Sequence, residues 1–321
     1  MQGKRVFVTG GAGFIGSMLI ERHIVGNEFA VYDSMSRDAL QHRNITDEDR
    51  ERIRIYRGDV LDGGYLAEAI ADFRPTHVVH CAAIAGIDTV IKSPTSTLRV
   101  NILGTANLLD ALHGSGVDLE RVVLFSTSEV FGQQAFQSTE TSSAIIGPVG
   151  EARWTYAVSK LADEHFGFAY FKEFGMPVTM VRPFNVYGPG QVGEGALSIF
   201  IQNALKNAPI SIHGDGTQIR AWLYVDDMIE GVTRALTMDE AIGESFNIGN
   251  SRAVTTIFGL AQTVTRILGS ESEISFSGRN VADVELRVPD VAKATDLLGF
   301  TALVGLEDGI PLTADYYRTH A

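Results

Sequence analysis

Two groups of residues, far apart in the chain, have the types and spacing of a redox site. The first is Gly10-Gly11-Ala12-Gly13-Phe14-Ile15-Gly16, which directly follows the apolar run Arg5–Thr9. The second is Tyr156-Ala157-Val158-Ser159-Lys160, with Ser126-Thr127-Ser128-Glu129 upstream. The glycine turn predicts a binding site for a dinucleotide pyrophosphate, and the tyrosine–lysine pair predicts a site of proton transfer. A chain with both is expected to move a hydride.

The glycine turn has Gly10, Gly13 and Gly16 between a predicted strand and a predicted helix. The first glycine permits the sharp turn, the second lets the backbone approach the pyrophosphate, and the third lets helix and strand pack closely. Asp33 ends the next predicted strand, where a carboxylate would accept hydrogen bonds from ribose hydroxyls and repel a 2′-phosphate. The pattern favours NAD over NADP. Arg37 could meet a 2′-phosphate, but we prefer to interpret it as a solvated loop residue.

Tyr156 and Lys160 are four residues apart on a predicted helix, so they share one face. A phenol titrates near 10 and is a poor base at neutral pH. A lysine ammonium about 5 Å away, at an effective dielectric constant near 20, would favour the phenolate by roughly 3 kcal/mol, or about two pKa units. Thr127 at a strand end could share the substrate oxygen with Tyr156, and Ser128 is expected beside it. Two interpretations of Glu129 stay open: a second base acting on a C–H beside a ketone, or a structural carboxylate.

Short β-branched runs alternate with helical patterns as far as residue 185, which predicts an α/β fold with a Rossmann-type, doubly wound parallel sheet. Ligands of such sheets lie beyond the carboxyl ends of the strands. We expect a NAD-binding domain at residues 1–185 and a smaller substrate-binding lobe at residues 186–321, with some later segments returning to the sheet. The predicted strands are Arg5–Thr9, Phe29–Tyr32, Ile53–Arg57, His77–His80, Arg121–Ser126 and Val178–Arg182. Asp59, after the third, could meet the adenine amino group or cap a turn.

The composition limits the partners and the compartment. A formal net charge of −13 argues against nucleic acid and anionic membranes as partners. An anionic substrate must then be held by local arginines, and Arg220 and Arg287 could clamp a diphosphate. A single cysteine, Cys81, and the absence of a signal-like or membrane-length apolar run predict a cytoplasmic protein. No metal-ligand spacing is evident. The helix from Tyr156 is apolar on more than one side, which predicts a homodimer or additional intrachain packing.

Taken together, the motifs resemble those of the extended short-chain dehydrogenase/reductase family, the NAD-dependent nucleotide-sugar epimerases, dehydratases and decarboxylases. The resemblance covers essentially the whole chain. It is carried by TGGAGFIG (Thr9–Gly16), GDV (Gly58–Val60), HCAA (His80–Ala83), STSEVFG (Ser126–Gly132), YAVSK (Tyr156–Lys160), RPFNVYGPG (Arg182–Gly190), GDGTQIR (Gly214–Arg220) and NIG (Asn247–Gly249).

The resemblance implies that Tyr156 removes a hydroxyl proton, usually at C4 of the sugar, while hydride passes to NAD. It also implies that Asn185, Arg220 and Arg287 hold the diphosphate of a nucleotide-diphosphate sugar. Cys81 is expected to be a small core residue beside the cofactor and not a nucleophile. The positions expected to bind the cofactor are Gly10, Gly13, Phe14, Ile15, Gly16, Asp33, Asp59, Val60, Cys81, Ala82, Ala83, Asn101, Ser126, Tyr156, Lys160 and Pro183.

The motifs are more specific for the family than for the reaction. An NDP-sugar 4-epimerase needs few catalytic groups beyond a tyrosine, a lysine and a threonine, which favours that activity. Thr127-Ser128-Glu129, Arg153-Trp154 and the segment Asp283–Pro289 look similar to UDP-glucuronate decarboxylases, which are the first alternative, and a 4,6-dehydratase is the second. Ser128-Glu129 departs from the small residues common in 4-epimerases, and the Asp-Glu pair usual in dehydratases is missing. Arg220-Ala221-Trp222 departs from the usual Arg-Asp.

Overall fold

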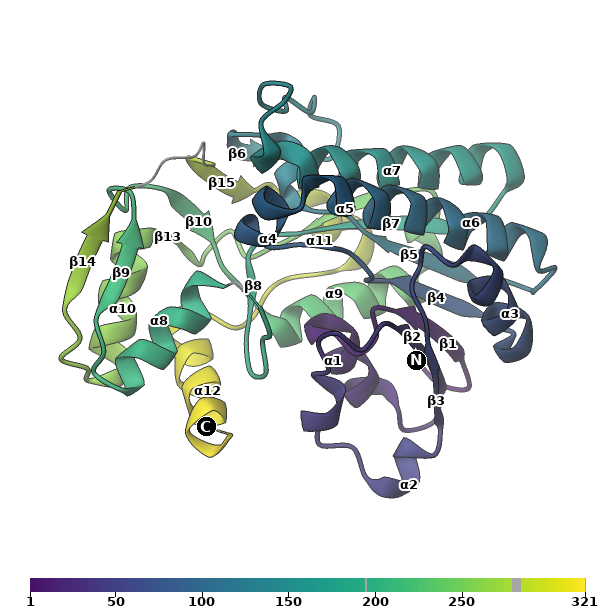
Figure 1. Cartoon of the computed structure of the whole chain (residues 1–321), viewed down its shortest axis with the longest axis horizontal. Coiled ribbons are helices and arrows are strands. Elements are labelled where there is room, and N and C mark those ends of the chain that lie inside the picture. Colours follow the sequence, from purple (N-terminus) through teal and green to yellow (C-terminus); the bar gives the residue numbers. More distant parts are fainter. Residues whose placement is uncertain (194, 279–283, 321) are drawn as a thin grey trace.

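The structure, a computed structural model that describes residues 1–193, 195–278 and 284–320, contains a seven-stranded parallel sheet at its centre (Figure 1). The strand order is β12-β7-β5-β4-β1-β2-β3, so the direction of winding reverses between β1 and β4. This order confirms the expected doubly wound α/β fold. The strands are β1 (Arg5–Thr9), β2 (Glu28–Asp33), β3 (Ile53–Arg57), β4 (His77–His80), β5 (Arg121–Phe125), β7 (Val178–Pro183) and β12 (Ser245–Ile248).

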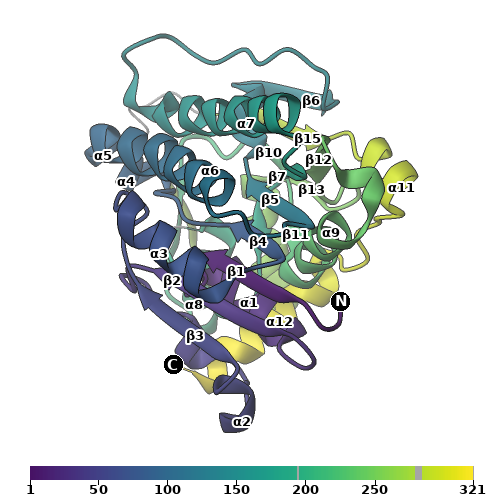
Figure 2. The same ribbon diagram turned by 90° about the vertical axis from the view of Figure 1, so that its right-hand side faces the viewer.

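Helices cover both faces of this sheet, as Figure 2 shows. In β1, Val6 and Val8 pack into one apolar core and Phe7 into the other, because successive side chains of a strand point to opposite faces. A sheet buried on both faces has continuous apolar strands, which is the pattern seen in the sequence. One face carries α1 (Phe14–His23) and α9 (Val225–Thr237), and the other carries α3 (Gly63–Phe73), α6 (Gly104–Gly114) and α7 (Thr155–Phe174).

The stretch Thr97–Leu112 has a helical sequence pattern throughout, but the structure does not form it as one regular α-helix. The chain forms α5 (Pro94–Leu98), then a π-helical turn, η2 (Arg99–Leu103), and only then α6. Single π-helical turns within helices are rare and often lie at functional sites. Here the turn carries Asn101, whose contacts are described below.

A smaller group of elements lies to one side of the main sheet (Figure 1). Among the described residues, its sheet has the order β13-β10-β15-β6, and two pairs of strands accompany it, β11 with β8 and β14 with β9. Both sheets contain segments from before and after residue 185. Strand β6 belongs to the smaller sheet, whereas β12 belongs to the larger sheet and α9 packs against it. The remaining elements are α2 (Asp47–Arg50), α4 (Ile87–Lys92), β6 (Gln134–Ser138), β8 (Val186–Tyr187), α8 (Ala196–Leu205), β9 (Ile210–His213), β10 (Ile219–Ala221), β11 (Leu223–Tyr224), β13 (Val254–Thr256), α10 (Ile257–Leu268), β14 (Ile274–Ser277), β15 (Leu286–Pro289), α11 (Ala292–Leu298) and α12 (Leu306–Thr319).

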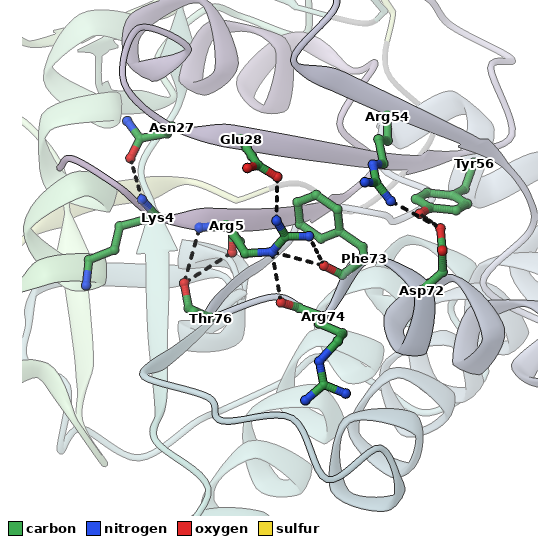
Figure 3. A network of polar contacts seen from close by, with 10 residues as sticks. All are labelled: Lys4, Arg5, Asn27, Glu28, Arg54, Tyr56, Asp72, Phe73, Arg74 and Thr76. Carbon is green, nitrogen blue, oxygen red and sulfur yellow. Dashed lines mark hydrogen bonds and ion pairs between the residues drawn. The ribbon is translucent and has the colours of Figure 1, made fainter.

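Polar contacts tie together the amino end of β1, shown in Figure 3. The guanidinium of Arg5 donates to the carbonyls of Phe73 and Arg74 and pairs with Glu28 of β2. The backbone N–H of Arg5 donates to the Thr76 hydroxyl at 3.2 Å. The amino edge of the sheet is therefore closed by its own side chains, and the carboxyl edge is where the predicted site residues gather. In the described part of the chain, no helix has both the length and the apolar character to cross a bilayer.

Candidate active site at the carboxyl edge of the sheet

A cavity of about 360 Å³ lies at the carboxyl ends of β1, β4, β5 and β7. It brings together the glycine turn, the Ser126–Glu129 segment and the Tyr156–Lys160 pair, as the spacing predicts. The sequence reasoning did not include two of the lining residues, Ala85 and Phe125, because neither carries a chemical group that a motif would reveal. The lining residues are Gly10, Gly13, Phe14, Ile15, Gly16, Cys81, Ala83, Ala85, Phe125, Ser126, Thr127, Ser128, Glu129, Tyr156, Lys160, Pro183, Asn185 and Arg287.

The glycine turn has the geometry that a dinucleotide pyrophosphate needs. Gly10 has φ +67°, and a Cβ there would lie 2.6 Å from the backbone nitrogen of Ala82. A Cβ on Gly16 would lie 2.7 Å from Gly11 Cα, so the turn and the helix pack too closely for any side chain. Gly13 is the N-cap of α1 and offers no capping side chain, which leaves the first N–H groups of the helix open to an anion.

Asp33, at the end of β2, ties the glycine turn to the neighbouring strand. Its carboxylate accepts from the backbone N–H of Ala12 at 3.0 Å and from that of Met35 at 2.8 Å. Burial raises the pKa of Asp33, and these two hydrogen bonds oppose the rise. Asp33 is not among the cavity-lining residues, so its bond to a ribose stays a prediction.

Four other expected cofactor residues also lie outside the lining. Asp59 caps a turn, since its carboxylate accepts from Leu61 N–H at 2.9 Å. Val60 is buried against Gly104, where a Cβ would lie 2.5 Å from the valine side chain, and Ala82 is in contact with Gly10. The amide of Asn101 accepts from Ile84 N–H at 2.8 Å, and it donates to the Ile84 carbonyl and to Ser159. Asn101 therefore fixes the loop after β4 against α7.

Tyr156 and Lys160 project from the first turns of α7 into the cavity. Thr127 hydrogen-bonds to the Tyr156 phenol, which places the predicted hydroxyl pair side by side. The thiol of Cys81 lines the same cavity, and burial raises its pKa to about 12, so it is not a ready nucleophile. Ser126 is held by a hydrogen bond to the buried carboxylate of Glu164, and that carboxylate also pairs with Arg182 at 2.7 Å.

The expectation that the protein alone lowers the pKa of Tyr156 is wrong. Burial, followed by the negative charge of Glu129, raises the pKa of Tyr156 above its ordinary value. The ammonium of Lys160 lies 3.0 Å from the carboxylate of Asp163, and both side chains are buried. Because Asp163 offsets its charge, Lys160 does not supply the lowering that the sequence spacing suggested. An acidic residue three positions after the lysine was visible in the sequence, and its importance was missed.

Glu129 lies between two buried arginines. Its carboxylate contacts the Arg153 guanidinium at 2.6 and 3.3 Å and that of Arg287 at 3.4 Å. Burial would raise the pKa of Glu129, but the charges of Arg287 and Arg153 lower it below the ordinary range. An ionised, ion-paired carboxylate of this kind is a weak base. The geometry therefore favours a structural and electrostatic role over that of a second base.

Of the three residues predicted to hold the substrate, two line the cavity and one does not. Asn185 and Arg287 line the cavity, and the amide of Asn185 donates to the Ala221 carbonyl at 2.8 Å. Arg220 is paired in register with Arg287 on the neighbouring strand, but its guanidinium donates to the Val284 carbonyl at 2.6 Å, and it is not among the lining residues. The diphosphate clamp stays a prediction. Asp283, the first residue of the segment that resembled decarboxylases, lies outside the described residues.

A family model and several curated proteins match this chain over most of its length. A model of the NAD dependent epimerase/dehydratase family matches residues 6–249. UDP-glucuronic acid decarboxylase 1 of Xenopus tropicalis is 32% identical over 98% of this chain and 72% of its own length. UDP-N-acetyl-alpha-D-glucosaminuronate decarboxylase of Bacillus cytotoxicus is 32% identical over 98% of both chains.

Solved structures are similar over the whole fold. UDP-glucose 4-epimerase of Thermotoga maritima, solved with UDP-glucose, has a TM-score of 0.87 at 30% identity, covering 98% of this chain and 99% of its own. UDP-glucuronic acid 4-epimerase of Bacillus cereus, solved with UDP-glucuronic acid and NAD, has a TM-score of 0.88 at 29% identity, covering 99% and 100%. The relatives thus include decarboxylases by sequence and epimerases by structure.

Proposed function

This chain belongs to the NAD-dependent epimerase/dehydratase family, and on that premise we propose that it decarboxylates a nucleoside-diphosphate uronic acid. The observation that carries the proposal is the cluster of Glu129, Arg153 and Arg287 beside Tyr156. At this end of the cavity two guanidinium groups contact one carboxylate, and the Arg287 guanidinium belongs to a cavity-lining residue. A carboxylate at C6 of the sugar would be attracted there, whereas a neutral hexose would gain nothing from it.

Arg153 is what allows Arg287 to act on an anion. Its guanidinium lies nearer to Glu129, at 2.6 Å, than the guanidinium of Arg287 does, at 3.4 Å. Arg153 is not among the cavity-lining residues, whereas Arg287 is. Glu129 and Arg287 both line the cavity, and Arg153 holds the Glu129 carboxylate from outside the lining.

The protein's own groups account for the proton steps. Tyr156, with Thr127, takes the proton of the sugar C4 hydroxyl as that carbon is oxidised. The bound NAD would supply the hydride acceptor and a positively charged ring, and the glycine turn with the N-terminus of α1 would hold its pyrophosphate. The ring charge would favour the phenolate form of Tyr156, which the protein side chains alone disfavour.

The 4-keto uronic acid formed in this way needs no further base. Its C6 carboxylate lies β to the ketone, so the C5–C6 bond breaks with loss of carbon dioxide and the electron pair passes to the C4 oxygen. A proton from water at C5, and a hydride that the bound cofactor would return to C4 together with a proton from Tyr156, would then give the nucleoside-diphosphate pentose. Decarboxylation needs no base at C5, which fits the ionised and ion-paired state of Glu129. A dehydratase would need such a base to remove the C5 proton.

The second candidate is the 4-epimerase that the sequence favoured. Thr127, Tyr156 and Lys160 are sufficient for it, and a UDP-glucuronic acid 4-epimerase has the same fold. The positive cluster suits a uronic acid in either case. We rank decarboxylation first because the two relatives that are 32% identical over 98% of this chain are decarboxylases of uronic acids.

One incubation separates the candidates. The purified protein is mixed with NAD and, separately, UDP-glucuronic acid, UDP-N-acetylglucosaminuronic acid or UDP-glucose, and the products are analysed by mass and by NMR. Loss of carbon dioxide supports the proposal. An isomer of unchanged mass means epimerisation, and loss of water means dehydration; either result overturns decarboxylation.

Binding measurements test the charge argument apart from turnover. UDP-glucuronic acid is expected to bind about tenfold more tightly than UDP-glucose. Arg153→Met leaves Glu129 to neutralise Arg287, so it should remove this preference while leaving the Kd for UDP-glucose, the matched control, within about twofold. A preference that survives Arg153→Met would contradict the role given to the cluster.

We further propose that the protein is a homodimer and acts in the cytoplasm. Exposed apolar side chains on α5, η2 and α7 support a partner there, among them Leu98, Leu103, Val158 and Phe168. The single cysteine, Cys81, leaves no internal disulfide and suits a reducing compartment.

A further inference from the structure

One buried acid beside Lys160 has no part in the proton and hydride steps. Asp163 lies one turn beyond Lys160 on α7, and its carboxylate accepts from the lysine ammonium at 3.0 Å. The side chains are 2% and 1% exposed. Tyr156, Lys160 and Asp163 are spaced at i, i+4 and i+7, so all three project from one face of the helix.

Stability alone does not explain this pair. Replacing a buried ion pair by apolar residues is often neutral or stabilising, because both charges must be taken out of water. The second carboxylate oxygen of Asp163, Oδ1, is buried without a hydrogen-bond partner among the described residues. A buried polar atom without a partner is costly, which points to a use for the carboxylate beyond holding the fold.

A chain of buried polar groups leads to the same carboxylate. Burial raises the pKa of Asp163, and Lys160 and Thr105 of α6 oppose that rise. The Thr105 hydroxyl hydrogen-bonds to Nε2 of His80, 2.9 Å away. Burial and the charge of Lys160 lower the pKa of His80 to about 3, so the ring is neutral, and its Nδ1 hydrogen-bonds to the hydroxyl of Thr9 at 2.6 Å.

This chain physically joins the two halves of the site. Thr9 ends β1 and directly precedes Gly10, His80 ends β4, and Lys160 lies beside Tyr156. All five side chains, those of Thr9, His80, Thr105, Lys160 and Asp163, are buried. The position of the lysine ammonium is therefore set from the glycine turn through Thr9, His80, Thr105 and Asp163.

We propose that Asp163 is a positioning residue that orients the Lys160 ammonium for the nicotinamide ribose and withholds its charge from Tyr156. This rests on the proposed function only in assuming that Tyr156 and Lys160 act together in proton transfer. Asp163 fixes where the ammonium points, and its negative charge keeps that ammonium from stabilising the phenolate. The phenolate then forms mainly when the cofactor's own positive charge is present.

Two properties of the protein follow, and each can be measured without a sugar. The first is the Kd for NAD, followed by protein fluorescence. The second is the pH midpoint of Tyr156 ionisation in the NAD-saturated protein, taken as the tyrosinate absorbance difference between each variant and the same variant carrying Tyr156→Phe. The charged groups that face Tyr156 are Glu129 from η3 (Ser128–Phe131), Arg287 from β15 and Asp163 from α7. Those acting on Asp163 are Lys160 and Glu164.

Two substitutions separate the charge from the positioning. Asp163→Asn keeps an acceptor of similar shape, so NAD should bind within about threefold of the native Kd while the Tyr156 midpoint falls by about one pH unit. Asp163→Leu removes the acceptor as well, so NAD binding should weaken about tenfold. Asp110→Asn is the matched control, because it removes an exposed carboxylate that bridges α6 to Tyr170 of α7 without touching Lys160. It should change neither measurement.

A double variant decides the matter even if these single variants fold poorly. Lys160→Met with Asp163→Leu replaces the buried pair by apolar side chains and is expected to fold. If Asp163 acts only through Lys160, the double variant binds NAD no more weakly than Lys160→Met alone. A further loss of NAD affinity in the double variant would overturn the proposal. So would Asp163 variants that lose thermal stability while keeping the native Kd and the native Tyr156 midpoint. Neither result depends on which sugar the enzyme uses.

Discussion

Replacing Glu129 by glutamine tests the buried charge cluster directly. The substitution removes the negative charge and keeps nearly the same volume. In the native protein the carboxylate is 13% exposed and lies against Arg153 and Arg287, whose side chains are 5% and 6% exposed. Glutamine would remove the carboxylate that both buried guanidinium groups contact.

The expected loss of stability follows from this geometry. Removing one partner of a buried ion pair costs about 3–5 kcal/mol, because the remaining charge stays buried. The glutamine carbonyl still accepts one hydrogen bond, which recovers about 1 kcal/mol. A net loss of about 3 kcal/mol corresponds to a fall in Tm of about 4–5 °C for a chain of this size.

The pH dependence has a definite sign. Because Arg287 and Arg153 lower the pKa of Glu129, the native carboxylate releases its proton more readily in the folded than in the unfolded chain. Its stabilisation is complete above the unfolded value, near 4.3, and is lost as the pH falls through the lower folded value. The difference between native protein and Glu129→Gln should therefore be constant between about pH 6 and pH 8 and should shrink only in acid.

Urea unfolding at several pH values measures both effects. Glu285→Gln is a suitable control, since Glu285 is exposed and its carboxylate accepts from the side-chain amides of Gln133 and Gln134. It should change the free energy of unfolding by no more than about 0.5 kcal/mol. A Glu129→Gln protein as stable as the native one, or a difference that grows in acid, would refute the reasoning.

Three further predictions concern the cofactor turn, the phenol and the subunit contact. Tyr156→Phe should reduce turnover about 1,000-fold with the Kd for NAD unchanged, measured by product formation and fluorescence titration; normal turnover would exclude Tyr156 as the acid/base. Gly10→Ala should weaken NAD binding at least tenfold, because its Cβ would lie 2.6 Å from the backbone nitrogen of Ala82. The control is Gly116→Ala, at φ +62° with open space around it. It should cost only about 1–2 kcal/mol of stability and leave NAD binding intact. Phe168→Glu should convert a dimer into a monomer that still binds NAD, as read by light scattering, and an unchanged mass would place the contact elsewhere.

Much of the site could be predicted from the sequence because its parts are local. The turn Gly10–Gly16 and the pair Tyr156–Lys160 are short segments whose backbone geometry follows from residue type and spacing. The short apolar runs that predicted the strands are also local features of the sequence, and parallel strands place their carboxyl ends at one edge of the sheet. The position of the cavity follows from these rules without knowledge of any long-range contact.

Only the tertiary structure decided the charges inside that cavity. Glu129, Arg153 and Arg287 come from η3, the segment before α7, and β15, and nothing in their separate sequence contexts fixes their distances. The two interpretations of Glu129 could not be separated until those distances were known. A carboxylate's role depends on which charges surround it and how much water they exclude, and both are properties of the folded chain.

The environment of Lys160 also combines a local feature of the sequence with contacts that only the tertiary structure provides. Its sequence placed it beside Tyr156 and suggested a positive charge acting on a phenol. The fold buried it against Asp163 and connected that pair, through Thr105 and His80, to Thr9 on a different strand. The amino-acid order determined which groups stand on one helix face, because helical spacing is fixed at short range. The electrostatic effect of those groups was decided by burial and by partners that are distant in sequence.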